Sequence, residues 1–528
     1  MKSRFLIYLL PLVLIICSAA ANAQSETRIT MESSSNSNSI TGPGSDASSL
    51  TGAANYFSTL SIHSDNSNEI NQFSFDMSGK YADDPRSDPS LFSFTNFTMK
   101  FAGPNTALSL GDTFDSFSQY SLSSALKGLS YKLGGKENDK QEITFVYGYA
   151  YPRWDNFRNS SDLQAVKRQA YGAKIKKGLS QYFTSGLSYI RSHDSDRVTA
   201  ADQLFDSDVV ALDWEYKPFE GASIMGESAW SGTSQSPAAG AVDIDSKGTA
   251  HRLAFEGQGG PIRLSAEYER ISPGFESVMG SSTPDREKVK IRWREKRSAK
   301  TSLTYGLLWF KDNLSGQKAN TRNNWRPEVA LTLKNVLGRQ YAYTDLSYKL
   351  DRQYGDTQGT TNHFTNLGYN DRFGIWDSNT NFGFTKYGTT LGGQDSNEFT
   401  YNTAVSTRVT RGNTILKPSL SLGGWTASDE LADETDRIYE VGLGLGVDLP
   451  KRNITSTFKI GKHKLLKGNA IADDSSKFFA NATVYTRAAW LSNGGRLFLR
   501  WQYNDFSYTN GTRDFTESGF TAGVNAQY

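Results

Sequence analysis

The chain has 528 residues with 57 basic and 55 acidic side chains, so its net charge of +2 gives no reason to expect a nucleic-acid partner. Only 37% of the residues are hydrophobic although 12% are aromatic, and no convincing helical periodicity accounts for the aromatic residues. This combination is unusual for a soluble helical protein. It is expected of a transmembrane β-barrel, because such a barrel has an apolar outer face, a polar inner face and aromatic side chains at both interfaces.

The first 23 residues are predicted to be a secretory signal peptide. Lys2 and Arg4 give a positive start, an apolar run follows, and residues 21–23 (Ala-Asn-Ala) place small side chains where signal peptidase reads them. A lipoprotein signal at Cys17 is the alternative, but the bulky Ile16 before it does not suit that cleavage. Since Cys17 is the only cysteine, cleavage after residue 23 leaves no disulfide, thiolate metal site or cysteine nucleophile.

Residues 24–53 form a Ser/Asn-rich N-terminal segment. Arg28–Glu32 can supply a first strand, in which case Ser33–Thr51 is the first outer loop. The alternative is a disordered leader inside the periplasm. Residues 54–528 are predicted to be one transmembrane β-barrel, since no run of about 18 apolar residues that could span a membrane as a helix follows the signal peptide.

Period-two alternation of apolar and polar residues recurs along this region and predicts strands. It is clearest at 210–216, 262–268, 439–447 and 497–503. In water such strands would bury their apolar face against a second sheet. In a membrane the apolar face contacts lipid, and the sheet closes so that no edge remains unpaired.

The connections between these strands favour the membrane interpretation, because from about residue 142 short and long connections alternate. Short turns on the periplasmic side and longer loops on the outer side are the pattern of outer-membrane barrels. The short connections lie near 219–221, 259–261, 298–300, 337–339, 373–374, 411–413 and 492–495. The long ones lie near 151–166, 191–207, 231–247, 271–286, 312–326, 351–362, 388–397, 425–437, 464–477 and 507–515.

The same alternation gives the strand number and direction. The last strand follows a long loop, so it runs inward and ends in the periplasm. With both chain ends periplasmic the number is even: about 26 strands if Arg28–Glu32 is the first, or about 24 if that segment is a loose tail and one weak strand, Leu122–Leu133, is miscounted. The predicted fold class is therefore all-β, a single large antiparallel transmembrane β-barrel.

The C-terminal strand carries the most specific signal. One of its faces is formed by Phe520, Ala522, Val524, Ala526 and Tyr528. In this feature the chain resembles outer-membrane β-barrels of Gram-negative bacteria, whose last strand is amphipathic, ends in an aromatic residue and is read by the barrel-assembly machinery. Phenylalanine is the commoner last residue in that family, so Tyr528 departs from it, and an ordinary edge strand ending in Tyr is the alternative. The resemblance implies Sec-dependent export, localisation in the outer membrane, and contacts with its lipid and with that machinery.

A ladder of basic residues alternates with apolar ones on two predicted strands. Cations on the lipid side would each cost about 2–4 kcal/mol at mid-bilayer, so they are predicted to face the lumen. They could form an anion-attracting wall or a docking surface for an acidic partner; alternatively, they pair with acidic residues such as Glu267 and Glu269 on a neighbouring strand. The ladder comprises Lys288, Lys290, Arg292 and Arg294, with Arg168, Lys174 and Lys176 on the other strand.

No enzyme, cofactor or metal site is predicted. None of the five histidines has metal-ligand spacing. The segment around His193 (Ser192 to Asp196) has the residue types of a serine hydrolase or a calcium site, but it falls where an outer loop is expected, and such residues are common in solvated loops. Gly111 and Gly128 are interpreted as bends in the sheet.

Two functions are compatible with this sequence. A barrel of about 26 strands has a backbone diameter of roughly 50 Å, and no long N-terminal segment is available as a plug or periplasmic domain, unlike in TonB-dependent receptors or ushers. The first hypothesis is a porin-like channel narrowed by inward loops. The second is a sheath around a partner protein. In strand number and in its lack of a plug the chain resembles, in architecture only, the barrels of porin–cytochrome electron conduits, which would imply a multihaem cytochrome in the lumen.

Overall fold

The computed structural model describes residues 24–52, 54–68, 70–86, 88–134, 141–157, 165–356, 359–389, 395–468, 473–491 and 494–528. The predicted signal peptide, residues 1–23, lies outside these ranges. Within them, no helix has the length and apolar character that a membrane crossing needs. The described helices are short 3₁₀ turns: η1 (Ser45–Ala47), η2 (Trp154–Phe157), η3 (Val336–Gly338) and η4 (Pro450–Arg452).

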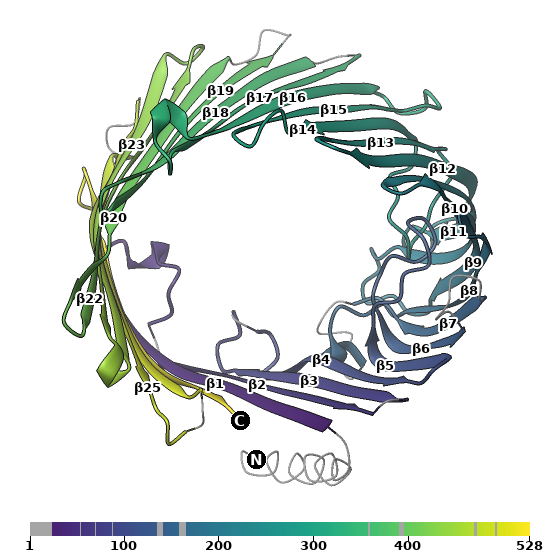
Figure 1. Cartoon of the computed structure of the whole chain (residues 1–528), viewed down its shortest axis with the longest axis horizontal. Coiled ribbons are helices and arrows are strands. Elements are labelled where there is room, and N and C mark those ends of the chain that lie inside the picture. Colours follow the sequence, from purple (N-terminus) through teal and green to yellow (C-terminus); the bar gives the residue numbers. More distant parts are fainter. Residues whose placement is uncertain are drawn as a thin grey trace.

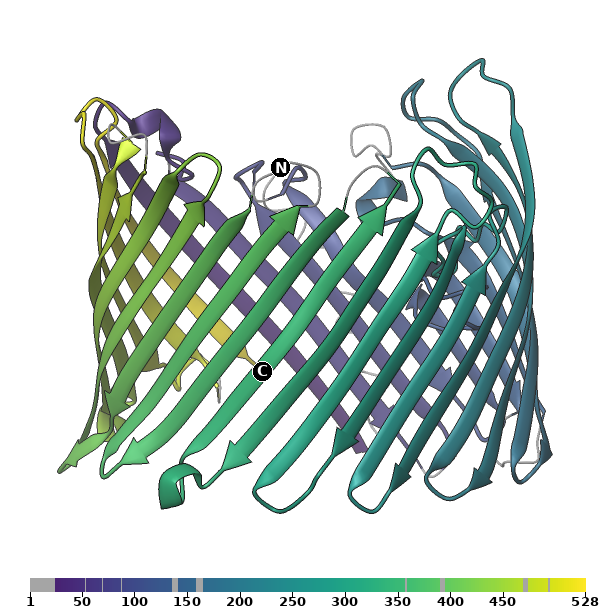
Figure 2. The same ribbon diagram turned by 90° about the horizontal axis from the view of Figure 1, so that it is seen from above.

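The strands form one closed antiparallel barrel (Figure 1), because β1 pairs with β2 on one side and with β27 on the other. β20 (Ser396–Thr407) and β21 (Val409–Arg411) both pair with β22 and act as one strand, so the barrel has 26 strands, as the sequence predicted. Figure 2 shows the strong tilt that closure of a sheet requires. The other strands are β1 Gln24–Thr41, β2 Ala54–Ser67, β3 Gln72–Ala82, β4 Phe92–Ala102, β5 Thr106–Thr113, β6 Leu126–Gly134, β7 Glu142–Tyr149, β8 Arg168–Ser180, β9 Phe183–Asp194, β10 Leu204–Phe219, β11 Ala222–Ser236, β12 Ile244–Gly259, β13 Ile262–Ile271, β14 Arg286–Glu295, β15 Thr301–Asp312, β16 Arg322–Lys334, β17 Tyr343–Gly355, β18 Gly359–Phe373, β19 Trp376–Thr389, β22 Thr414–Asp429, β23 Glu434–Leu449, β24 Ile454–Leu466, β25 Ser475–Arg487, β26 Arg496–Tyr508 and β27 Phe515–Gln527.

The outer face of the barrel is apolar because the two-residue period of each strand sends its Val, Leu and aromatic side chains outward. In β23, Val441 and Leu443 are about half exposed, and Leu443 pairs across the sheet with Leu420 and Ile460. Exposed apolar side chains of this kind recur around the whole barrel, and only lipid can cover so continuous an apolar surface. A closed, even-stranded antiparallel barrel with this surface is the architecture of bacterial outer-membrane proteins, which places the chain in that membrane.

The connections differ in length on the two rims, as the sequence predicted, but several outer loops are shorter than expected. The connection predicted at 351–362 is largely strand, since β17 runs to Gly355 and β18 begins at Gly359. Conversely, the periplasmic connections 335–342 and 488–495 are longer than tight turns. Strands that continue into water have polar side chains on both faces, so the alternation that marks a strand is lost before the hydrogen-bonded ladder ends.

The first strand is longer than the sequence indicated. β1 extends from Gln24 through Thr41, so most of the Ser/Asn-rich stretch predicted as the first outer loop is strand, and only 42–53 connect β1 to β2. Residues 33–39 are all serine or asparagine, so neither face of this part of the strand is apolar and the period-two signal is absent. Its ladder is nonetheless complete, with Thr30 to Thr41 paired with Gln527 to Thr516.

Gly111 in β5 is required by the backbone. Its φ is 98°, a conformation that residues with a Cβ atom rarely adopt, and a Cβ there would collide with the carbonyl oxygen of Phe97 on β4. We expect Gly111→Ala to destabilise the barrel by about 1–3 kcal/mol, seen as a lower unfolding temperature in heat-modifiability gels. Gly232→Ala on β11 is the matched control, because a Cβ there meets no atom within 4 Å. Equal effects of the two substitutions would contradict this account.

Candidate functional site

The third outer connection, residues 114–125, folds into the barrel instead of away from it (Figure 1). It joins β5 and β6, which are among the shorter strands of the barrel, and it lies against the inner wall formed by β8 to β13. The connection forms its own tight turn, in which Ser118 bridges to Leu122 and the backbone N–H of Phe117 donates to the Leu122 carbonyl at 3.0 Å. It is thus an ordered element of the lumen.

A patch of apolar side chains on the lumen wall, more than half of them alanine, provides the seat for this connection. Phe117, Tyr120 and Leu122 pack against the patch and are themselves almost fully buried. Since each full burial of a large apolar side chain stabilises by about 1.5–3 kcal/mol, this apolar contact is one part of what holds the connection against the wall. The alanines of the patch leave room for the connection beside the wall. The patch comprises Ala170, Ile190, Val209, Ala211, Ala229, Ala250 and Ile271.

A second inward connection, residues 272–285 between β13 and β14, covers the first. The rings of Phe275 and Tyr120 meet edge to face with 5.7 Å between their centroids. The backbone N–H of Ser123 donates to the Met279 carbonyl at 3.0 Å, and that of Ser281 donates to the Gln119 carbonyl at 2.8 Å. Residues 114–125 and 272–285 therefore form one unit, which we call the inward shelf.

Two wall carboxylates anchor the tip of the shelf. Glu227 on β11 accepts the backbone N–H groups of Gln119 and Tyr120 at 3.2 and 2.9 Å. Glu269 on β13 accepts the Tyr120 hydroxyl at 3.0 Å and the Gln119 side-chain amide at 2.9 Å. Burial, reinforced by the negative charge of Glu269, raises the pKa of the Tyr120 hydroxyl well above its usual value, so this group remains a donor.

Ion pairs lie beneath the shelf, and one of them balances the charge of Glu269. Lys288 on β14 lies 3.1 Å from both Glu267 and Glu269. Arg252 on β12 pairs with Glu267 at 2.8 Å, and Lys174 pairs with Asp213 at 2.8 Å while also donating to the Phe117 carbonyl. Buried charges are tolerated only when they are paired and hydrogen-bonded, and here the wall and the shelf satisfy one another.

The basic ladder predicted from sequence divides into two groups. Arg168, Lys174 and Lys288 are paired, Arg168 with both carboxylate oxygens of Asp194 at 2.8 Å, as the charge-pairing alternative predicts. The other group is exposed, and no ion pair is found for its members among the residues that the structure describes. This exposed group consists of Lys176, Lys290, Arg292 and Arg294.

The segment around His193 does not form a catalytic constellation. Ser192, His193 and Asp194 belong to β9, not to a loop as the sequence indicated, so successive side chains point to opposite faces. Ser192 and Asp194 are buried on the lumen face, whereas His193 is exposed on the other face, 3.4 Å from Asp206. The described ranges also contain no group of three or more metal-ligand side chains.

The C-terminal face that resembles an assembly signal lies on the outer surface of β27. Phe520 and Tyr528 are exposed there, and Ala526 pairs with Met31 of β1. The role of this face in assembly stays a prediction.

The sequence did not reveal the inward shelf. Its first connection overlaps the weak strand predicted at Leu122–Leu133, whereas β6 begins only at Leu126. The apolar residues Phe117, Tyr120 and Leu122 within a loop were the available signal, since exposed loops are usually polar.

No protein-family model matches the chain, and no curated protein matches it significantly. Solved structures that resemble it include the P pilus usher translocation pore, with 12% identity, a TM-score of 0.39 and coverage of 94% of this chain and 99% of that one. The outer-membrane transporter YddB from Escherichia coli has 8% identity, a TM-score of 0.46 and coverage of 96% and 81%. OccAB4 from Acinetobacter baumannii has 9% identity, a TM-score of 0.32 and coverage of 96% and 100%. At these identities and TM-scores the resemblances say nothing about function.

Proposed function

We propose that this protein is a channel that passes small solutes across the outer membrane and that the inward shelf sets its narrowest part. The observation that carries this proposal is the built attachment of the shelf, with an apolar seat, two buried carboxylate anchors and a second connection packed over the first. Porin barrels of 16–18 strands already leave an aqueous channel, and a wall of 26 strands encloses a wider one. Such a barrel needs an internal element to restrict passage.

The exposed cations of β14 support a preference of this channel for anions. Lys290, Arg292 and Arg294 follow one another on the lumen face, and the register places Arg263 of β13 beside Arg294. Adjacent cations repel one another, so this arrangement is stabilised by anions that enter the lumen. Rings or rows of such side chains set the charge selectivity of pores.

Arg292→Glu combined with Arg294→Glu tests this preference. We expect the ratio of anion to cation permeability, measured from reversal potentials in planar bilayers under a KCl gradient, to fall and to cross unity. Lys451→Glu combined with Arg452→Glu in η4 is the matched control, since it makes the same charge change at the rim. Lys288→Glu is less suitable, because it would also leave Glu267 and Glu269 without their partner. An unchanged ratio in the double variant would refute the anion preference.

A sheath around a partner protein is the second candidate. The observation in its favour is that the shelf occupies only the side of the barrel near β8 to β13, and no described segment crosses the rest of the ring in Figure 1. Purification from the native membrane in mild detergent, followed by mass spectrometry and a haem absorbance spectrum, separates the candidates. A stoichiometric haem protein would support the electron conduit, and a single chain without haem would support the channel.

A further inference from the structure

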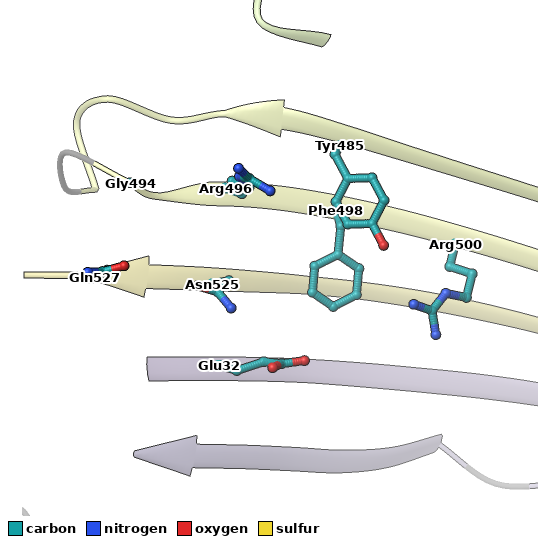
Figure 3. Close-up of a pocket in the computed structure, with 8 residues that line it drawn as sticks. All are labelled: Glu32, Tyr485, Gly494, Arg496, Phe498, Arg500, Asn525 and Gln527. Carbon is teal, nitrogen blue, oxygen red and sulfur yellow. The ribbon is translucent and has the colours of Figure 1, made fainter. Parts of the chain in front are cut away.

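A second charged site lies on the lumen face where the barrel closes, away from the shelf. Figure 3 shows the residues that line it. It is a pocket of about 400 Å³ lined by side chains from β25, β26, β27 and β1. Arg496, Phe498 and Arg500 come from β26, and their neighbours Leu497 and Leu499 face the lipid, so the alternation of this strand directs the three into the lumen.

The strand register arranges the charges of this pocket in an ordered row. Arg496 lies opposite Asn525 of β27, and Asn525 lies opposite Glu32 of β1. A cation, an amide and an anion therefore follow one another across three hydrogen-bonded strands, each about 4.8 Å from the next. Arg500 is the next residue after Phe498 on the lumen face of β26, and it adds a second cation to the pocket.

The floor of the pocket is fixed by a glycine. The Phe498 ring lies across β27 at Gly523, where a Cβ atom would collide with it, and the Tyr485 ring supports it with 6.1 Å between the ring centroids. Phe498 is almost fully buried, whereas Arg496, Arg500 and Glu32 are exposed. In the part of the chain that the structure describes, these three charged groups take part in no ion pair.

We propose that this pocket binds a small zwitterion that carries an additional acid group, namely an acidic α-amino acid. Arginine binds carboxylates through two parallel N–H donors, so Arg496 and Arg500 can each hold one carboxylate of such a ligand. Glu32 then faces the ammonium group, and the Asn525 amide lies between the two charges. The proposal shares with the channel function only the requirement that water and solutes reach the lumen.

The test is calorimetric titration of the full-length barrel in detergent with L-glutamate, with glutarate, which lacks the ammonium group, and with L-glutamine, which lacks the second acid. We expect L-glutamate to bind most tightly. Arg496→Gln and Arg500→Gln should each weaken its binding by about tenfold or more, since each removes a charge-assisted bidentate contact. Glu32→Gln should abolish the preference for L-glutamate over glutarate.

Lys459→Gln is the matched control, since it removes a lumen cation of β24 that lies over the Phe479 ring, outside the pocket. It should leave binding unchanged, and heat-modifiability gels confirm that each variant is folded. Gly523→Ala is a second probe, because its Cβ would collide with the Phe498 ring and with the Ser33 backbone carbonyl beside Glu32 without changing any charge, and it should also weaken binding. The absence of saturable L-glutamate binding, equal binding of glutarate, or an equal loss in Lys459→Gln would overturn the proposal. Because no current is measured, such a failure is distinct from a failure of the channel function.

Discussion

Replacing residues 116–124 with a short Gly-Ser linker is expected to increase single-channel conductance by about twofold or more, because conductance follows the cross-section of the narrowest part of a pore. The replacement is sterically simple, since Thr113 at the end of β5 pairs directly with Leu126 at the start of β6. A short hairpin turn can therefore join the two strands without disturbing their register. Conductance in planar bilayers measures the effect.

The control for this variant is the same replacement at 238–242, in the outer connection between β11 and β12. It removes a connection that does not contribute to the buried cluster beneath the shelf, so conductance should stay at the wild-type value. A folded 116–124 variant with unaltered conductance would mean that the shelf does not form the narrowest part of the lumen, and the channel proposal would then lack its main support.

The shelf also shows why an inward connection can be rigid. Loops are usually mobile because their backbone groups are hydrogen-bonded to water and few apolar contacts hold them. Here the backbone N–H groups of Gln119 and Tyr120 are bonded to a wall carboxylate, and Leu122 and Tyr120 are fully buried. The wall thus replaces water as hydrogen-bonding partner and supplies an apolar contact that water cannot supply.

Most of the barrel could be predicted from the sequence, because each membrane-spanning strand has one face in contact with lipid and the other face in the lumen. That constraint produces the alternation at 439–447, while the alternation of short and long connections gave the direction of the last strand. Prediction from this pattern fails where both faces of a strand are polar. Residues 33–39 are all serine or asparagine and give no apolar face, although this part of β1 is fully paired with β27. Backbone hydrogen bonding, which the side-chain pattern does not report, sets the length of β1.

The lumen sites were predictable only in part. Alternation assigned Lys288 and Arg292 to the lumen face, but which of them is paired depends on the neighbouring strand, where Glu267 and Glu269 approach Lys288 and Ser265 lies opposite Arg292. Glu227 had no distinguishing signal, since a polar residue on a polar face is expected. The pocket at the closing seam could not be predicted, because Glu32 and Arg496 approach one another only when β1 pairs with β27.

Removing the carboxylate of Glu227 is expected to release the shelf from the wall. In Glu227→Ala the backbone N–H groups of Gln119 and Tyr120 lose their acceptor in a site nearly closed to water, and each unsatisfied group costs about 1–3 kcal/mol. We expect residues 114–125 to become accessible to protease in the folded barrel. The current should become noisy and its mean conductance should rise toward that of the 116–124 replacement.

Glu227→Gln distinguishes loss of the hydrogen bonds from loss of the charge. The glutamine side chain keeps one carbonyl acceptor but cannot serve two backbone donors as a carboxylate does, so an intermediate effect is expected. Tyr120→Phe removes only the hydroxyl that donates to Glu269 and leaves both bonds to Glu227 in place, so its effect should be smaller than that of Glu227→Ala. If all three variants kept wild-type protease resistance and conductance, the apolar seat alone would hold the shelf, and the hydrogen bonds to Glu227 and Glu269 would contribute nothing measurable to its attachment. The ranking of these variants therefore separates a shelf fixed by polar anchors from one fixed by packing.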